Sequence, residues 1–136
     1  MNANLKLILG IFAGMLVFIL CVAVIQFAGH ALIPPPENAS IATPEELAAY
    51  LSERPVALVP VLLGYVLGSL AGGFAAARIA GPRAMPAAVA IGVLGMVANF
   101  FNLQAIPHPL WFVIVSFLIF VPMAWLGGRL AAGRAA

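Results

Sequence analysis

The sequence predicts an all-α membrane protein, a single domain over residues 1–136 that folds as a bundle of four transmembrane helices with a short amphipathic helix in the first outer loop. Two observations lead to this prediction. The 136-residue chain is 65% hydrophobic and 7% charged, whereas about 25% of the residues in ordinary soluble domains are charged. In addition, four apolar stretches are separated by breaks that contain proline or glycine, and each is close to or above the roughly 20 residues that a helix needs to cross the hydrocarbon core.

The first predicted span covers residues 5–33. A secretory signal has an apolar stretch of only about 7–15 residues, so this longer segment is better interpreted as a retained helix that tilts or projects beyond the bilayer. The span ends at three consecutive prolines, Pro34, Pro35 and Pro36, because proline lacks the amide hydrogen that a helix needs and clashes with the preceding turn.

The outer loop, residues 34–55, contains all four acidic residues of the chain: Glu37, Glu45, Glu46 and Glu53. Within it, Thr43 is a favourable N-cap, Pro44 suits the first helical position and Glu46 completes a capping box. One face of the following segment carries, at helical spacing, Leu47, Tyr50 and Leu51. We therefore expect a short amphipathic helix over residues 44–53 that lies on the membrane surface or across the mouth of the bundle.

The other three spans are predicted at residues 56–80, 85–104 and 109–126. Gly81 and Pro82 separate the second span from the third, and a short segment with two prolines, residues 106–109, separates the third from the fourth. We expect Gly127 and Gly128 to end the fourth span. Pro122 should kink that span, because a proline inside a helix leaves a carbonyl without its partner.

The distribution of lysine and arginine predicts the orientation, since these residues accumulate in cytoplasmic loops. One side of the membrane would hold the N-terminus, the turn between the second and third spans, and the C-terminal tail. This side carries five basic residues, Lys6, Arg78, Arg83, Arg129 and Arg134. The other side carries Arg54 alone. We therefore expect both termini in the cytoplasm.

Several classes of function are disfavoured by what the sequence lacks. The basic residues are scattered and form no stripe that could follow a phosphate backbone, which argues against nucleic acid as a partner. The single cysteine, Cys21, lies in an apolar run and is expected to act as a small hydrophobic residue. No Asp, Glu, Lys or Arg lies deep in a predicted span, although proton-coupled transporters generally need one. Ser69 and Ser116 have no histidine or acid at their depth, so we expect neither an enzyme nor a cofactor.

Small residues predict where the helices pack, because membrane helices associate by close approach of their backbones. The second span carries a stripe at four-residue spacing, in the manner of a glycine zipper, formed by Gly64, Gly68 and Gly72. The third span carries a looser stripe with Gly92 and Gly95. We expect both stripes to contact other helices of this chain, of a second copy or of a partner membrane subunit.

Polar residues gather toward the outer side of the predicted bundle and form a candidate ligand site: Gln26, His30, Glu37, Asn99, Asn102 and His108. Gln26 and His30 share one helix face, because they lie four residues apart. Two histidines and a carboxylate could bind a divalent metal or respond to pH, but their spacing matches no metal motif. In the simplest alternative, the amides only hydrogen-bond across helices.

Three segments, GHALIPPP, AGGFAAARIAGPR and IPHPLWF with the later PMAWLGGRLA, resemble a group of small bacterial inner-membrane proteins with four helices. The resemblance covers most of the chain and implies a bacterial inner (cytoplasmic) membrane location. That group has no established activity that could be assigned to these residues.

The sequence thus leaves three hypotheses for function. The first is a non-enzymatic bundle that acts as an accessory subunit or binds a lipid or another apolar ligand between its helices. The second is a small oligomeric channel or transporter whose wet path would be lined by Gln26, Asn99, Asn102 and Ser116. The third is an outward-facing metal or pH-sensing site at His30, Glu37 and His108.

Overall fold

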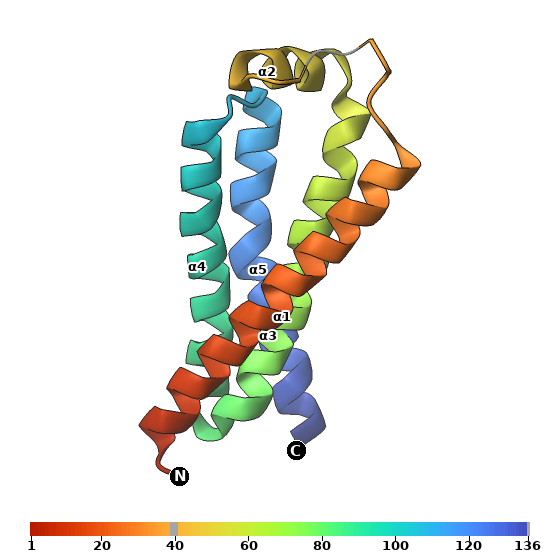
Figure 1. Ribbon diagram of the computed structural model, residues 1–136. Helices are drawn as coiled ribbons and strands as arrows, with labels where there is room; N and C mark the ends of the chain where they lie inside the picture. Colours follow the sequence, from red (N-terminus) through yellow and green to blue (C-terminus); the bar gives the residue numbers. More distant parts are fainter. Residues whose placement is uncertain (39–40, 136) are drawn as a thin grey trace.

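The computed structural model describes residues 1–38 and 41–135, which form an all-helical bundle (Figure 1). The elements follow one another as α1 (Ala3–Leu32), α2 (Pro44–Glu53), the 3-10 turn η1 (Pro55–Leu58), α3 (Val59–Ala80), the 3-10 turn η2 (Gly81–Arg83), α4 (Ala84–Ala105) and α5 (Leu110–Ala135). Both chain termini lie at one end of the bundle, and α2 lies across the other end (Figure 1).

Three helical segments in the described part of the chain are long and apolar enough to cross a membrane: Ala3–Leu32, Pro55–Ala105 and Leu110–Gly133. The second of these reverses direction at η2 and so contains both α3 and α4. The outer surface of α1 carries large apolar side chains that are more than half exposed, among them Ile8, Phe12, Val24 and Phe27. Such a surface is unfavourable in water and suits contact with lipid, so the chain is a membrane protein.

The reversal between α3 and α4 depends on Gly81. Its φ of 60° and ψ of −110° lie in a region that side-chain-bearing L-residues rarely adopt, while glycine reaches it readily. Pro82 follows directly and cannot donate the amide hydrogen that would continue α3. The backbone conformation of one glycine therefore brings α4 back alongside α3.

The predicted end of the fourth span is wrong. Gly127 and Gly128 do not terminate α5, which continues to Ala135. A Cβ atom at Gly127 would collide with the Leu70 carbonyl oxygen of α3, and one at Gly128 would lie 2.5 Å from the Ala88 Cβ of α4. The two glycines lie within α5 and allow it to pack closely against α3 and α4. They do not end the helix. Pro122 likewise lies inside α5 and does not end it.

The glycine stripe of α3 lies against α1. A Cβ at Gly72 would be 2.8 Å from the Gly14 carbonyl oxygen, and one at Gly68 would be 2.9 Å from a Val22 methyl carbon. Gly64, at the end near α2, has its nearest neighbour at 3.5 Å, which is ordinary van der Waals contact. Close approach thus needs glycine at Gly68 and Gly72, but not at Gly64.

The glycines of α1 were not predicted as contact sites, although Gly10 and Gly14 lie four residues apart. A Cβ at Gly10 would be 2.6 Å from the Ala76 carbonyl oxygen of α3. On α4, Gly92 and Gly95 face α5, where a Cβ would be 2.7 Å from the Val121 Cα and 2.6 Å from the Phe120 ring, respectively. The predicted glycines of the third span therefore contact a helix of the same chain.

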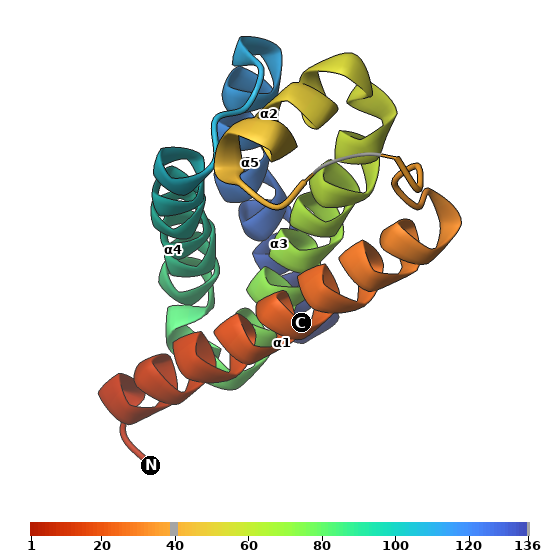
Figure 2. The same ribbon diagram turned by 45° about the horizontal axis from the view of Figure 1, so that its top comes forward.

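Helix α1 packs along α3 but diverges from α4. Near its N-terminal end, α1 is held close to both helices, since a Cβ at Gly14 would meet Ala76 of α3 and Ile91 of α4. Toward α2, the C-terminal half of α1 leans away from α4 while it stays beside α3 (Figures 1 and 2). The bundle is therefore tightly packed at the end with the termini and is wider at the α2 end.

Candidate functional site

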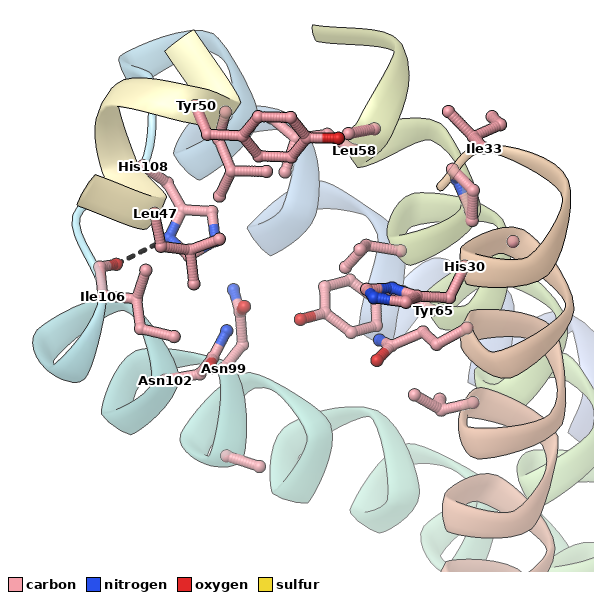
Figure 3. Close-up of a pocket in the computed structure, with 18 of the residues that line it drawn as sticks. His30, Ile33, Leu47, Tyr50, Leu58, Tyr65, Asn99, Asn102, Ile106 and His108 are labelled. Carbon is pink, nitrogen blue, oxygen red and sulfur yellow. Dashed lines mark hydrogen bonds between the residues drawn. The ribbon is translucent and has the colours of Figure 1, made fainter. Parts of the chain in front are cut away.

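The wide end of the bundle holds a cavity of about 440 Å³. It lies between the diverging halves of α1 and α4, with α3 and α5 behind it and α2 across its end (Figure 3). Three of its lining residues are exposed: Ile41, which precedes α2, and, on two helices, His30 of α1 and Ala98 of α4. The cavity therefore reaches the surface of the molecule between these two helices.

The inner end of the cavity is formed by aromatic side chains that pack on one another. The Tyr65 ring of α3 lies 4.8 Å from the Phe120 ring of α5, centroid to centroid, and the Phe18 ring of α1 lies 6.1 Å from Phe120. All three side chains are less than 9% exposed. This cluster joins three helices and separates the cavity from the close-packed half of the bundle.

The outer end of the cavity is closed by α2 and η1, which contribute Leu47, Tyr50, Leu51 and Leu58. The capping box positions the start of α2: the Glu46 amide donates to Thr43 Oγ1 at 3.2 Å, and the Thr43 amide donates to Glu46 Oε2 at 3.3 Å. Leu51 is only 8% exposed. The helix spans Pro44–Glu53, the predicted range, and it begins at the residue that the capping pattern predicts.

Asn99 of α4 provides a buried polar group at the cavity wall. Its Nδ2 donates to Ser116 Oγ of α5 at 2.9 Å, and Ser116 Oγ in turn donates to the Val113 carbonyl oxygen at 3.0 Å. Asn99 Oδ1 is buried and accepts no hydrogen bond from any described group. The amide of Asn99 is therefore hydrogen-bonded through its nitrogen but not through its oxygen. A buried carbonyl oxygen without a donor costs about 1–3 kcal/mol.

Other polar groups surround the same space. Figure 3 shows the Asn99 and Asn102 side chains extending from α4 toward the Tyr65 hydroxyl, which interacts with Asn102. Gln26 and His30 of α1 line the opposite side. The structure therefore brings together five of the six residues that the sequence analysis selected: Gln26, His30, Asn99, Asn102 and His108.

His108 is oriented by two contacts in the connection between α4 and α5. Its ring stacks on Phe112, with the centroids 4.8 Å apart and the planes inclined by 19°. Its Nδ1 lies 2.6 Å from the Ile106 carbonyl oxygen. A carbonyl oxygen only accepts, so Nδ1 must carry the hydrogen, and in the neutral ring Nε2 is then an acceptor. In Figure 3 the second ring nitrogen is on the cavity side.

Glu37 does not belong to the site. It is exposed and lies outside the lining of the cavity. His30 and His108 lie on opposite sides of that cavity (Figure 3). In residues 1–38 and 41–135 no three His, Cys, Asp or Glu side chains come close enough to hold a metal ion. The predicted metal site at His30, Glu37 and His108 is therefore wrong, because these three side chains do not form a cluster. A pH-sensing role of the histidines stays a prediction.

Two phenols that line the cavity were absent from the predicted ligand site, and Ser116, which was predicted to line a wet path, lies outside the lining. Tyr50 and Tyr65 both line the cavity, but at the sequence level a tyrosine near a span end is equally typical of the membrane interface. Ser116 is fully buried as the partner of Asn99 and does not line the cavity. The position of Ser116 could be predicted only if one knew which faces of α4 and α5 pack together.

The wall of the cavity is uncharged apart from its histidines. Of its described lining residues none is Lys, Arg, Asp or Glu. The polar members are three amides, two phenols and two imidazoles: Gln26, Asn99, Asn102, Tyr50, Tyr65, His30 and His108. Chemically, this set can exchange hydrogen bonds with a ligand but offers no permanent counter-charge.

Comparison of the chain with protein-family models, with curated proteins and with solved structures finds no match. The resemblance to small bacterial four-helix membrane proteins therefore stays a prediction, and the cavity itself is the basis for assigning a function.

Proposed function

We propose that the chain crosses the membrane four times, with both termini in the cytoplasm and α2 at the outer surface. The end of the bundle that holds the termini and η2 carries Lys6, Arg78, Arg83 and Arg129; the side chain of Arg134 lies outside the described part. The α2 end carries Arg54 and the glutamates. Since positively charged residues favour the cytoplasmic side, this charge distribution supports the orientation.

In this orientation α2 acts as an amphipathic cap on the bundle. Its Leu47 and Leu51 side chains line the cavity, whereas Glu45 and Glu53 are exposed. A helix with one apolar and one charged face is suited to the boundary between lipid and water. The cap would shield the cavity from water on the outer side of the membrane.

Within this topology, the function that the geometry supports best is the binding of an apolar ligand between the helices, without catalysis. The observation that carries this proposal is the cavity of about 440 Å³, which has a mostly apolar lining and a few polar groups that converge on it. Ligand sites are typically clefts of about 300–1,000 Å³ with this composition. The exposed His30 and Ala98 mark a route between α1 and α4 that faces lipid in the proposed topology.

Binding is favoured over conduction by the position of the polar residues. Gln26, Asn99 and Asn102 line the cavity, but Ser116 is buried behind Asn99 as its hydrogen-bond partner. Below the cavity the aromatic cluster and the close α1–α3 contact fill the bundle, and a Cβ at Gly10 would lie only 2.6 Å from Ala76 of α3. A path lined by these polar residues would therefore end halfway across the bundle.

Native mass spectrometry of the protein extracted from its membrane tests the proposal. We expect one copy of the chain to retain one apolar molecule. The variant Ala98→Trp, which places a bulky ring in the cavity mouth, should lose it. Val97→Trp is the matched control, because Val97 is the preceding residue on α4, is 48% exposed and lies outside the cavity lining. Retention of the molecule by Ala98→Trp, or its absence from the wild-type protein, would contradict the proposal.

A further inference from the structure

The polar groups of the cavity narrow the class of ligand. Resting on the proposed function, we propose that the cavity binds an uncharged amphiphile whose head group donates hydrogen bonds, such as a long-chain alcohol or a monoacylglycerol. The head would lie between α4 and α2, beside Asn99 and His108. The chain would leave between α1 and α4 into the surrounding lipid.

The cavity wall contains no lysine, arginine or carboxylate among its described residues that could pair with a charged head group. A phosphate or carboxylate head group in this cavity would lose its hydration and would have no lysine or arginine to pair with. A cationic amine would likewise have no carboxylate to pair with, since the described lining contains none of these residues. Burying an unpaired charge is far more costly than burying a polar group that is hydrogen-bonded. Anionic phospholipids and cationic lipids are therefore disfavoured, and an uncharged head is favoured.

Two hydrogen-bond acceptors lie at one end of the cavity, Asn99 Oδ1 and His108 Nε2. Asn99 is 3% exposed; one N–H of its Nδ2 is donated to Ser116, whereas its Oδ1 accepts from no described group. His108 presents Nε2 as a second acceptor, because Nδ1 is engaged by the Ile106 carbonyl. Two acceptors at one end of the cavity select a head group that donates. A methyl ester of equal length accepts hydrogen bonds but donates none, so it would leave both acceptors unsatisfied.

The volume of the cavity limits the size of the ligand. A volume of about 440 Å³ corresponds to about 15 water molecules at ~30 Å³ each. That space accommodates a small head group and the first part of one chain, but not a complete two-chain lipid. The remainder of the chain must project, and the route past Ala98 leads to the lipid-facing surface. Specificity would thus reside in the head group and would tolerate variation in the chain.

Three ligands with an 18-carbon chain separate these requirements: monoolein, which has two hydroxyl donors, methyl oleate, which has none, and oleyl phosphate, which is anionic. Their dissociation constants are measured from the ligand-dependent rise in melting temperature, at pH 8 in lauryldimethylamine oxide, whose head group has no donor. We expect monoolein to bind at least about tenfold more tightly than either of the others, the factor that one net hydrogen bond of about 1.4 kcal/mol provides.

The variant Asn99→Leu assigns the preference to the buried amide. It should lower the preference for monoolein over methyl oleate by about two- to thirteenfold, the factor that corresponds to the loss of a net hydrogen bond of about 0.5–1.5 kcal/mol, without weakening methyl oleate. Ser69→Ala is the matched control, because Ser69 also has a buried unpartnered oxygen but does not line the cavity; it should keep the wild-type preference. If Asn99→Leu does not fold, His108→Phe keeps the ring on Phe112, removes the second acceptor and should lower the preference.

Equal affinities of the wild-type protein for the three ligands would overturn the head-group assignment. They would mean that a water molecule donates to Asn99 Oδ1 whichever ligand is bound. The proposed function would not be affected by this result. Tighter binding of oleyl phosphate would overturn the assignment as well. Saturable binding of none of the three, together with no co-purifying molecule, would instead refute the proposed function itself.

Discussion

Replacing single glycines of α3 by alanine should have opposite effects at two positions of the same stripe. At Gly72 the new Cβ would lie 2.8 Å from the Gly14 carbonyl oxygen, 3.0 Å from the Phe18 Cβ and 3.1 Å from an Ile91 methyl carbon. Backbone and Cβ atoms cannot rotate away, so α1 must move off α3. Overpacking of this kind costs about 1–3 kcal/mol, of which the better helix propensity of alanine returns about 0.5–1 kcal/mol.

At Gly64 the same methyl group has its nearest neighbour at 3.5 Å, on Val22, so it adds contact without displacement. We therefore expect Gly72→Ala to lower the free energy of unfolding by up to about 2.5 kcal/mol and Gly64→Ala to leave it unchanged or raise it by up to about 1 kcal/mol. Reversible unfolding in mixed micelles of detergent and sodium dodecyl sulfate measures both. Equal effects of the two variants would refute the reasoning, since the residues differ only in how closely α1 approaches.

Two further predictions follow from single hydrogen bonds. Thr43→Ala removes the oxygen that accepts from the Glu46 amide and should destabilise α2 locally by about 1 kcal/mol; faster amide hydrogen exchange confined to residues 44–53 would support this, and unchanged exchange would contradict it. Ser116→Ala leaves the buried Asn99 Nδ2 without an acceptor and should cost about 1–3 kcal/mol. Ser69→Ala removes a buried oxygen that has no partner and should cost less than about 0.5 kcal/mol. If unfolding experiments show a larger loss of stability for Ser69→Ala than for Ser116→Ala, the two hydroxyl environments are misassigned.

The sequence was sufficient for the helices and most of their ends. Proline and the capping pattern around Thr43 act locally, so they predict the bounds of α2 and the breaks at Gly81 and after Ala105. Gly127 misled the prediction because a glycine that ends a helix and a glycine that admits a neighbouring helix are the same residue in the sequence. Only the collision of a Cβ at Gly127 with the Leu70 carbonyl distinguishes the two roles.

The candidate site was predictable to the level of membrane depth. Gln26, Asn99 and Asn102 were predicted to lie near one end of the bundle because each lies a countable distance from the end of its span, and the structure brings them to one cavity. Depth says nothing about direction around the helix axis, so the pairing of Asn99 with Ser116 and the exclusion of Glu37 could not be derived. The cavity itself arises from the divergence of α1 and α4 (Figure 2), which no local pattern encodes.

The measurement that tests the central claim most directly is photolabelling of the membrane-embedded protein with a monoacylglycerol that carries a diazirine near its head group, followed by peptide mapping. The account predicts saturable labelling of the cavity wall, at residues such as Leu47, Tyr65 and Asn102, that excess monoolein removes. Labelling that does not saturate and falls on the lipid-facing side of α4, at Val97, Phe100 and Phe101, would contradict it.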